Sequence, residues 1–133
     1  TLEQIRPDGL ILCYPVISMG EKGHLGSRDN LLGIDSTAAA QEAVSIELKV
    51  SEHMPPVFIW HTLDDEVVPV ENSLFLVQAL RRFGISFELH VFPHGPHGLA
   101  LADAETAKQG QSEYIQPDCA EWINLAGKWI ERL

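Results

Sequence analysis

Two loops in the second half of the chain carry carboxylate and imidazole side chains in positions that favour proton-transfer chemistry. The first loop contains Asp64 and Asp65, and the second, farther along the chain, contains His94 and His97. A carboxylate that accepts a hydrogen bond from an imidazole fixes the tautomer of the ring and stabilises its protonated form. These residue types therefore indicate an acid–base pair, provided that the fold brings the two loops together.

Several of these polar residues also have a simpler interpretation. His94 and His97 are spaced as His-x-x-His, but two ligands without a third in register are weak evidence for a metal site, so we expect no metal. His61 opens the first loop and is expected to be a strand-end residue that hydrogen-bonds loop backbone. A solvated acidic face is expected for three residues farther on, Asp103, Glu105 and Glu113.

Three apolar segments have the length of β-strands and would carry these loops. They cover residues 9–15, 57–60 and 86–92. The first two are apolar almost throughout, which is typical of parallel strands buried on both faces. The third alternates between apolar and polar residues, as a strand with two different faces does.

Helical patterns separate these strands and follow the last one. They cover residues 37–44 with one further turn at 45–48, residues 71–83, and residues 118–133, whereas residues 16–35 are expected to form a long loop with a helical turn near 30–32. Either Ser36 or Thr37 is expected to cap the first of these helices. Gly84 is the expected C-terminal cap of the second, and Asp118 the expected N-cap of the third.

This alternation of strands and helices predicts an α/β fold with three layers, α/β/α, around a parallel sheet of about three strands. We expect residues 1–133 to form a single domain, with Trp60, Trp122 and Trp129 in its core. Sites in open parallel sheets form beyond the carboxyl ends of the strands, which is where both polar loops lie. The first strand is expected to have an unpaired edge, and such an edge favours pairing with another segment or another copy of the chain.

Several segments resemble acetylesterase-type members of the α/β-hydrolase superfamily, those described as acetylxylan-esterase-like. The resemblance covers nearly the whole chain, over residues 14–18, 30–33, 55–62, 65–69, 71–73, 90–92 and 97–99. It implies the C-terminal half of an α/β-hydrolase fold, with a triad of serine, acid and histidine in that chain order. Asp65, which directly precedes Glu-Val-Val-Pro, carries over as the acid, and His97, within Gly-Pro-His-Gly, carries over as the general base. Asp64, one residue earlier, remains the alternative acid.

The chain departs from this family at the nucleophile. No Gly-x-Ser-x-Gly elbow is present, and the nearest string, 110–114, lacks the second glycine and follows the histidine instead of preceding it. Ser18 follows the first strand without a glycine elbow. In the family, the oxyanion-hole loop and the serine both lie before the segment that begins here. The sequence is therefore expected to be a fragment that carries the acid and the histidine of the triad.

The resemblance implies a carboxylesterase that hydrolyses short-chain acyl or acetyl esters without a cofactor. An N-terminal half would complete the site and supply the serine. The alternative is a catalytically inactive, truncated hydrolase domain that acts through self-association or through complementation by a partner. A nucleotide-binding protein is disfavoured, since neither a Gly-x-Gly-x-x-Gly motif nor a phosphate loop is present.

The composition narrows the choice of partners and of compartment. A net charge of −10 without a Lys/Arg cluster disfavours binding to nucleic acid and to anionic membranes. No apolar run approaches the ~20 residues that span a bilayer, and residues 1–4 show no secretory signal. Cys13 and Cys119 form no spacing motif and are expected to be free thiols in a reducing compartment, which indicates a cytoplasmic location.

Overall fold

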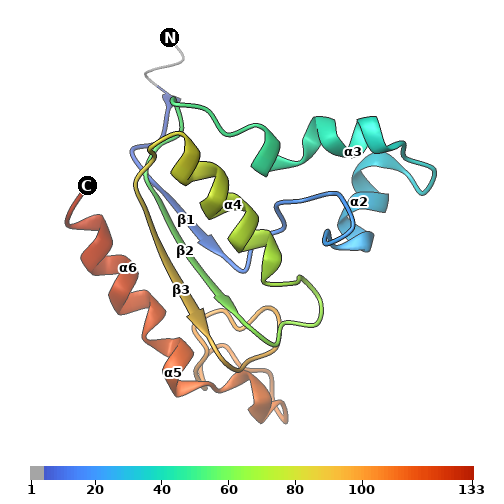
Figure 1. The fold of residues 1–133 in the computed structure, drawn as a ribbon. Helices are drawn as coiled ribbons and strands as arrows, with labels where there is room; N and C mark the ends of the chain where they lie inside the picture. Colours follow the sequence, from blue (N-terminus) through green and yellow to red (C-terminus); the bar gives the residue numbers. More distant parts are fainter. Residues whose placement is uncertain (1–4) are drawn as a thin grey trace.

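A three-stranded parallel sheet forms the centre of the computed structural model, which describes residues 5–133 (Figure 1). The strands β1 (Leu10–Cys13), β2 (Val57–Thr62) and β3 (Phe87–Phe92) lie side by side in that order. All three predicted strands are therefore confirmed. The first is shorter than its apolar run because Tyr14 adopts a left-handed backbone conformation, with φ of 38°, and Pro15 has no N–H to donate.

The helices fall largely where their patterns predict them. They are α2 (Leu25–Leu32), α3 (Ala38–Val44), α4 (Glu71–Arg82), α5 (Pro117–Ala120) and α6 (Trp122–Ile130), with 3₁₀ turns η1 (Ile46–Leu48) and η2 (Ser112–Tyr114). Thr37 is the N-cap of α3, and its hydroxyl accepts a hydrogen bond from the N–H of Ala40. The predicted cap at Asp118 is wrong, because Pro117 begins α5 one residue earlier, where its missing N–H costs nothing, and Gln116 precedes it as the N-cap.

Helix α2 is a full helix, although only one helical turn was expected in this stretch. It begins after His24, whose ring Nδ1 accepts a hydrogen bond from the N–H of Ser27, 3.2 Å away. Neither α2 nor α3 has a buried residue, and in Figure 1 both lie to one side of the sheet. They therefore contribute little to the core that positions the strands.

Helix α4 and helix α6 cover opposite faces of the sheet, which confirms the three-layer arrangement (Figure 1). Every residue of β2 is buried, and its side chains alternate between the two faces. Ile59 packs against Leu76 and Leu80 of α4. On the opposite face Trp60 stacks on Trp122, with ring centroids 5.3 Å apart, so the predicted core position of the tryptophans is confirmed.

The two outer strands, β1 and β3, are the edges of this sheet. Ile11, in the middle of β1, keeps 39% of its surface exposed. The expected open edge at the first strand is therefore present. None of the helices between residues 5 and 133 is long and apolar enough to cross a membrane, and both cysteines are free thiols.

Candidate active site

The loops that follow β2 and β3 meet beyond the carboxyl ends of the strands, and they bring Asp65 and His97 together. Nδ1 of His97 lies 2.7 Å from Oδ2 of Asp65, a distance typical of a charge-assisted hydrogen bond. The Asp65 side chain is fully buried, whereas the His97 side chain keeps 28% of its surface exposed. The acid is thus enclosed and the imidazole lies at the surface of the site.

Asp65 is held by the backbone of its own loop. Its Oδ1 accepts hydrogen bonds from the N–H groups of Val67, at 2.9 Å, and Val68, at 2.8 Å. Two backbone donors and one imidazole satisfy a carboxylate that would otherwise be costly to bury. This arrangement leaves Oδ2 directed at the imidazole of His97.

His61, at the end of β2, is a second imidazole beside the same carboxylate. Its Nε2 lies 2.9 Å from the carbonyl oxygen of Val68 and 3.3 Å from Oδ2 of Asp65, and its Nδ1 lies 2.8 Å from Oγ of Ser73. Burial lowers the pKa of His61 below its ordinary value and outweighs the opposing effects of Val68 and Asp65. The prediction that His61 hydrogen-bonds loop backbone is confirmed, but its contact with Asp65 was missed.

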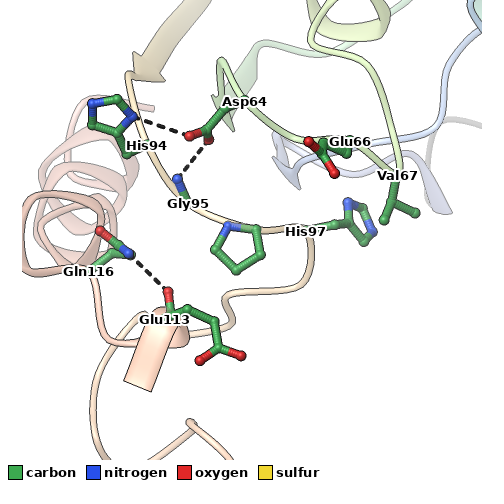
Figure 2. Close-up of a pocket in the computed structure, with 9 residues that line it drawn as sticks. Asp64, Glu66, Val67, His94, Gly95, His97, Glu113 and Gln116 are labelled. Carbon is green, nitrogen blue, oxygen red and sulfur yellow. Dashed lines mark hydrogen bonds and ion pairs between the residues drawn. The ribbon is translucent and has the colours of Figure 1, made fainter. Parts of the chain in front are cut away.

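Asp64, the alternative acid, faces away from His97 and holds the histidine loop instead (Figure 2). Its Oδ1 accepts the N–H of Gly95 at 2.8 Å, and its Oδ2 lies 3.2 Å from Nδ1 of His94. Desolvation raises the pKa of Asp64, but the hydrogen bonds from His94 and Gly95 together outweigh it and lower the pKa below its ordinary value. The geometry therefore pairs Asp65 with His97.

Tyr14 packs against His97 from the end of β1 and was not singled out by the sequence analysis. The two rings meet edge to face with centroids 4.8 Å apart, and the phenol oxygen accepts a hydrogen bond from the N–H of Ala100 at 3.3 Å. Both Tyr14 and Ala100 have left-handed backbone angles, with φ of 38° and 53°. Such strain in non-glycine residues is often found at functional sites. The sequence feature that could have pointed to Tyr14 is its place between an apolar strand and a proline.

Asn72, at the start of α4, ties the loop after β1 to the loop after β2. Its Oδ1 accepts hydrogen bonds from the N–H groups of Ile17, at 3.0 Å, and Ser18, at 2.9 Å. Its amide nitrogen donates to the carbonyl oxygens of Lys22 and Pro69, at 2.8 and 3.0 Å. The completely buried amide thus uses all of its hydrogen-bonding groups to fix these loops.

A groove of about 380 Å³ lies beside His97 and is lined partly by carboxylates (Figure 2). Its walls come from the two loops and from the segment around η2, and comprise Asp64, Glu66, Val67, His94, Gly95, Pro96, His97, Glu113 and Gln116. None of these lining residues is Lys or Arg, so the groove favours neutral groups over anions.

Neither the serines of the described residues nor His94 adds a catalytic group to the Asp65–His97 pair. Ser18 is buried and its hydroxyl accepts the N–H of Gly20 at 3.1 Å, while Ser112 is exposed at the start of η2. Within residues 5–133 no serine hydroxyl is hydrogen-bonded to His97, and no three His, Cys, Asp or Glu side chains converge as metal ligands. His94 contacts Asp64, so the His-x-x-His spacing does not produce a shared site with His97.

Two proteins of known activity are similar to most of this chain. Endo-1,4-beta-xylanase B of Butyrivibrio fibrisolvens is 48% identical over 100 residues, which are 75% of this chain and 16% of that protein. The acetylxylan esterase of Xylanibacter ruminicola is 36% identical over 103 residues, which are 74% of this chain and 22% of that protein.

A solved structure supports the same relationship. The acetyl ester-xyloside bifunctional hydrolase of Caldicellulosiruptor lactoaceticus superposes with a TM-score of 0.82 at 46% identity, over 96% of this chain and 43% of that one. The chain thus spans less than half the length of these relatives. Residues 22–115, well over half of the sequence, match the prolyl oligopeptidase family. The chain therefore belongs to the prolyl oligopeptidase family of α/β-hydrolases.

Proposed function

We propose that this chain supplies the acid and the general base of a serine carboxylesterase that removes short acyl groups, such as acetyl, from an alcohol. The observation that carries the proposal is the 2.7 Å hydrogen bond between the buried Asp65 carboxylate and the partly exposed His97 ring. Because Nδ1 of His97 is bonded to Asp65, Nε2 is the nitrogen that can exchange a proton with a nucleophile. The similarity to an acetylxylan esterase supports the acetyl preference.

The proposed reaction follows from this geometry. As the serine oxygen bonds to the ester carbonyl carbon, its proton passes to Nε2 of His97, and Asp65 stabilises the resulting imidazolium. His97 then gives that proton to the departing alcohol as the carbon–oxygen bond breaks. Water repeats the sequence and releases the acid from the acyl-serine. The serine and the oxyanion hole would come from an N-terminal half outside this sequence.

Hydrolysis of p-nitrophenyl acetate tests the proposal in two steps. The 133-residue chain alone is expected to show no more activity than its His97→Ala variant. Mixing it with the part of the Caldicellulosiruptor hydrolase that it does not cover should then create activity, and His97→Ala should remove that activity. A complex that forms with no gain in hydrolysis would overturn the proposal. Activity of the chain alone that depends on His97 would instead place a nucleophile within it.

The second candidate function is a catalytically inactive hydrolase domain that works through association. The exposed edge of β1 favours it, because an unpaired parallel strand presents backbone donors and acceptors to another strand. We propose an N-terminal half as the occupant of this edge. Analytical ultracentrifugation over a range of concentrations tests this idea, because a homodimer would show that a second copy occupies the edge instead. A monomer that does not bind the added half would contradict the idea.

The proposal also covers the substrate, the partners and the cellular location of the chain. A small ester is the proposed substrate, and the net charge of −10 disfavours nucleic acid and anionic membranes as partners. The two free thiols, Cys13 and Cys119, support a cytoplasmic location, where thiols stay reduced. Fractionation of cells that produce the complete protein tests the location, and recovery from the medium would contradict it.

A further inference from the structure

We propose that His61 is a positioning residue, a neutral imidazole that holds Asp65 in place beside His97. The proposal rests on the proposed function only in so far as Asp65 and His97 act as acid and base. The two imidazoles share one carboxylate oxygen, since Nδ1 of His97 lies 2.7 Å and Nε2 of His61 lies 3.3 Å from Oδ2. Two imidazolium ions on one buried carboxylate would repel each other, so the site requires that only one ring gains a proton.

The hydrogen bonds of His61 determine which of its nitrogens carries the proton. Nε2 lies near two oxygens that can only accept, the Val68 carbonyl oxygen at 2.9 Å and the ionised Asp65 carboxylate. Nε2 must therefore be the N–H, which donates to Val68. A neutral ring then has an unprotonated Nδ1, and this nitrogen accepts the hydroxyl proton of Ser73 at 2.8 Å. Every polar group of the ring is satisfied in this single neutral tautomer.

Burial keeps the ring in that neutral form. His61 has no exposed surface, and its position on β2 places it between the sheet and α4. The titratable groups around it are Asp65 on its own loop, His97 on the loop after β3, and Glu71 at the start of α4. The loss of hydration on burial lowers the pKa of His61, and a positive charge on His97 lowers it further.

In this arrangement the negative charge of Asp65 stabilises a positive charge on His97 and not on His61. His61 offers Asp65 and the Val68 carbonyl the positive end of an N–H dipole without taking a proton in the neutral range. His97 is then the ring whose protonated form the carboxylate stabilises. His61 also connects Val68 to Ser73, so the turn that holds Asp65 is tied to α4.

Nuclear magnetic resonance of the ¹⁵N-histidine-labelled chain tests the proposal without requiring catalysis. We expect His61 to show the Nε2–H tautomer and no titration from about pH 8 to pH 5. We also expect a low-field proton signal from Nδ1–H of His97, as for other N–H groups bonded to a carboxylate. Titration of the His61 ring within this range, or an Nδ1–H tautomer, would overturn the proposal.

Two variants test whether His61 acts on the His97 pair. His61→Gln places an amide nitrogen near the position of Nε2 and should retain the His97 signal, whereas His61→Leu removes the donor and should shift or broaden it. The backbone amide spectrum reports whether each variant is folded. A folded His61→Leu with an unchanged His97 signal would reduce His61 to a packing role.

A third variant keeps the test decisive if His61→Leu fails to fold. His61→Asn is polar, but its shorter amide cannot reach both Val68 and Asp65, so it should disturb the His97 signal where His61→Gln does not. Equal signals in the two variants would contradict the proposal. These results are independent of ester hydrolysis, so the proposed function can fail in the mixing experiment while the role of His61 stands.

Discussion

The hydroxyl of Thr62 donates a hydrogen bond of 2.7 Å to the carbonyl oxygen of Gly95, and this bond joins the end of β2 to the histidine loop. Asp64 accepts the N–H of the same glycine at 2.8 Å, so Gly95 is held from both of its backbone polar groups. His97 lies two residues farther along this loop. The position of the proposed base therefore depends on the strand that carries the proposed acid.

Removal of the Thr62 hydroxyl tests that connection. Thr62→Val keeps the shape of the side chain but leaves the buried Gly95 carbonyl without its donor, so we expect it to reduce the free energy of unfolding by about 1–3 kcal/mol. Thr62→Ser retains the hydroxyl and serves as the control. Urea unfolding of both variants gives the difference, and equal stabilities would show that the hydrogen bond contributes nothing.

A methyl group at Gly95 should disturb the same loop. A Cβ there would lie 2.7 Å from Cδ1 of Leu99 and 3.1 Å from Cγ2 of Thr62, on a backbone with φ of 143°. We expect Gly95→Ala to cost about 2–4 kcal/mol of unfolding free energy, from strain and overpacking together. Gly98→Ala is the matched control, because Gly98 has φ of 82° but no atom within 4 Å of its Cβ position. Thermal unfolding that ranks Gly98→Ala as the more harmful change would contradict this explanation.

Asp65 and Asp64 are expected to differ sharply in their effect on catalysis. Asp65→Asn replaces a carboxylate that accepts from His97 with an amide, and it should reduce kcat of the complemented protein by about 10⁴-fold. Asp64→Asn keeps an oxygen acceptor for Gly95 and should reduce kcat by no more than about tenfold, the value of one hydrogen bond. Equal losses on p-nitrophenyl acetate would mean that the two carboxylates share the role.

The pKa of His61 predicts a pH dependence of stability. Burial lowers this pKa in the folded protein, so the unfolded chain binds a proton more readily. Stability is therefore greatest above the unfolded pKa of 6.5 and falls as the pH is lowered through that value. The urea midpoint should decrease from about pH 7.5 to pH 5.5, and less so in His61→Gln. A wild-type midpoint that rises on acidification would contradict the predicted sign.

Two neighbouring residues of helix α6, Trp129 and Ile130, should differ in their contribution to stability. Trp129 is 5% exposed and packs against Phe58, whereas Ile130 is 53% exposed. We expect Trp129→Ala to reduce the free energy of unfolding by about 3–5 kcal/mol, and Ile130→Ala by less than about 1 kcal/mol. Denaturant unfolding measures both values. Similar losses would mean that Ile130 is covered in solution, for example by a second copy of the chain.

The strands were accessible from sequence because they depend on local patterns, whereas the roles of Asp65 and His97 were expected from the resemblance to the α/β-hydrolase family. An apolar run buried on two faces and an Asp-x-x-Val-Pro string are visible without knowledge of the packing. The positions of the two loops then follow from the rule that parallel strands carry sites at their carboxyl ends. Asp64 and Asp65 could be separated only by the loop geometry, since adjacent residues point in different directions.

The remaining parts of the site depend on contacts between distant segments. The placement of Tyr14 against His97 requires the pairing of β1 with β2 and a left-handed residue before Pro15. The role of His61 depends on Val68 and Ser73, which a local pattern does not place around one ring. The last helical segment begins at Pro117, before the predicted cap Asp118, because a proline without an N–H fits the first helical position.

The four hydrogen bonds of Asn72 have a consequence for the kinetics of assembly. They keep the loops after β1 and β2 in one arrangement, and Thr62 and Asp64 do the same for the loop after β3. An incoming segment that provides the nucleophile would thus meet a half-site whose conformational entropy has already been lost during folding. On binding, only the incoming segment would have to become ordered. The association rate should therefore be limited by encounter and by the folding of that segment.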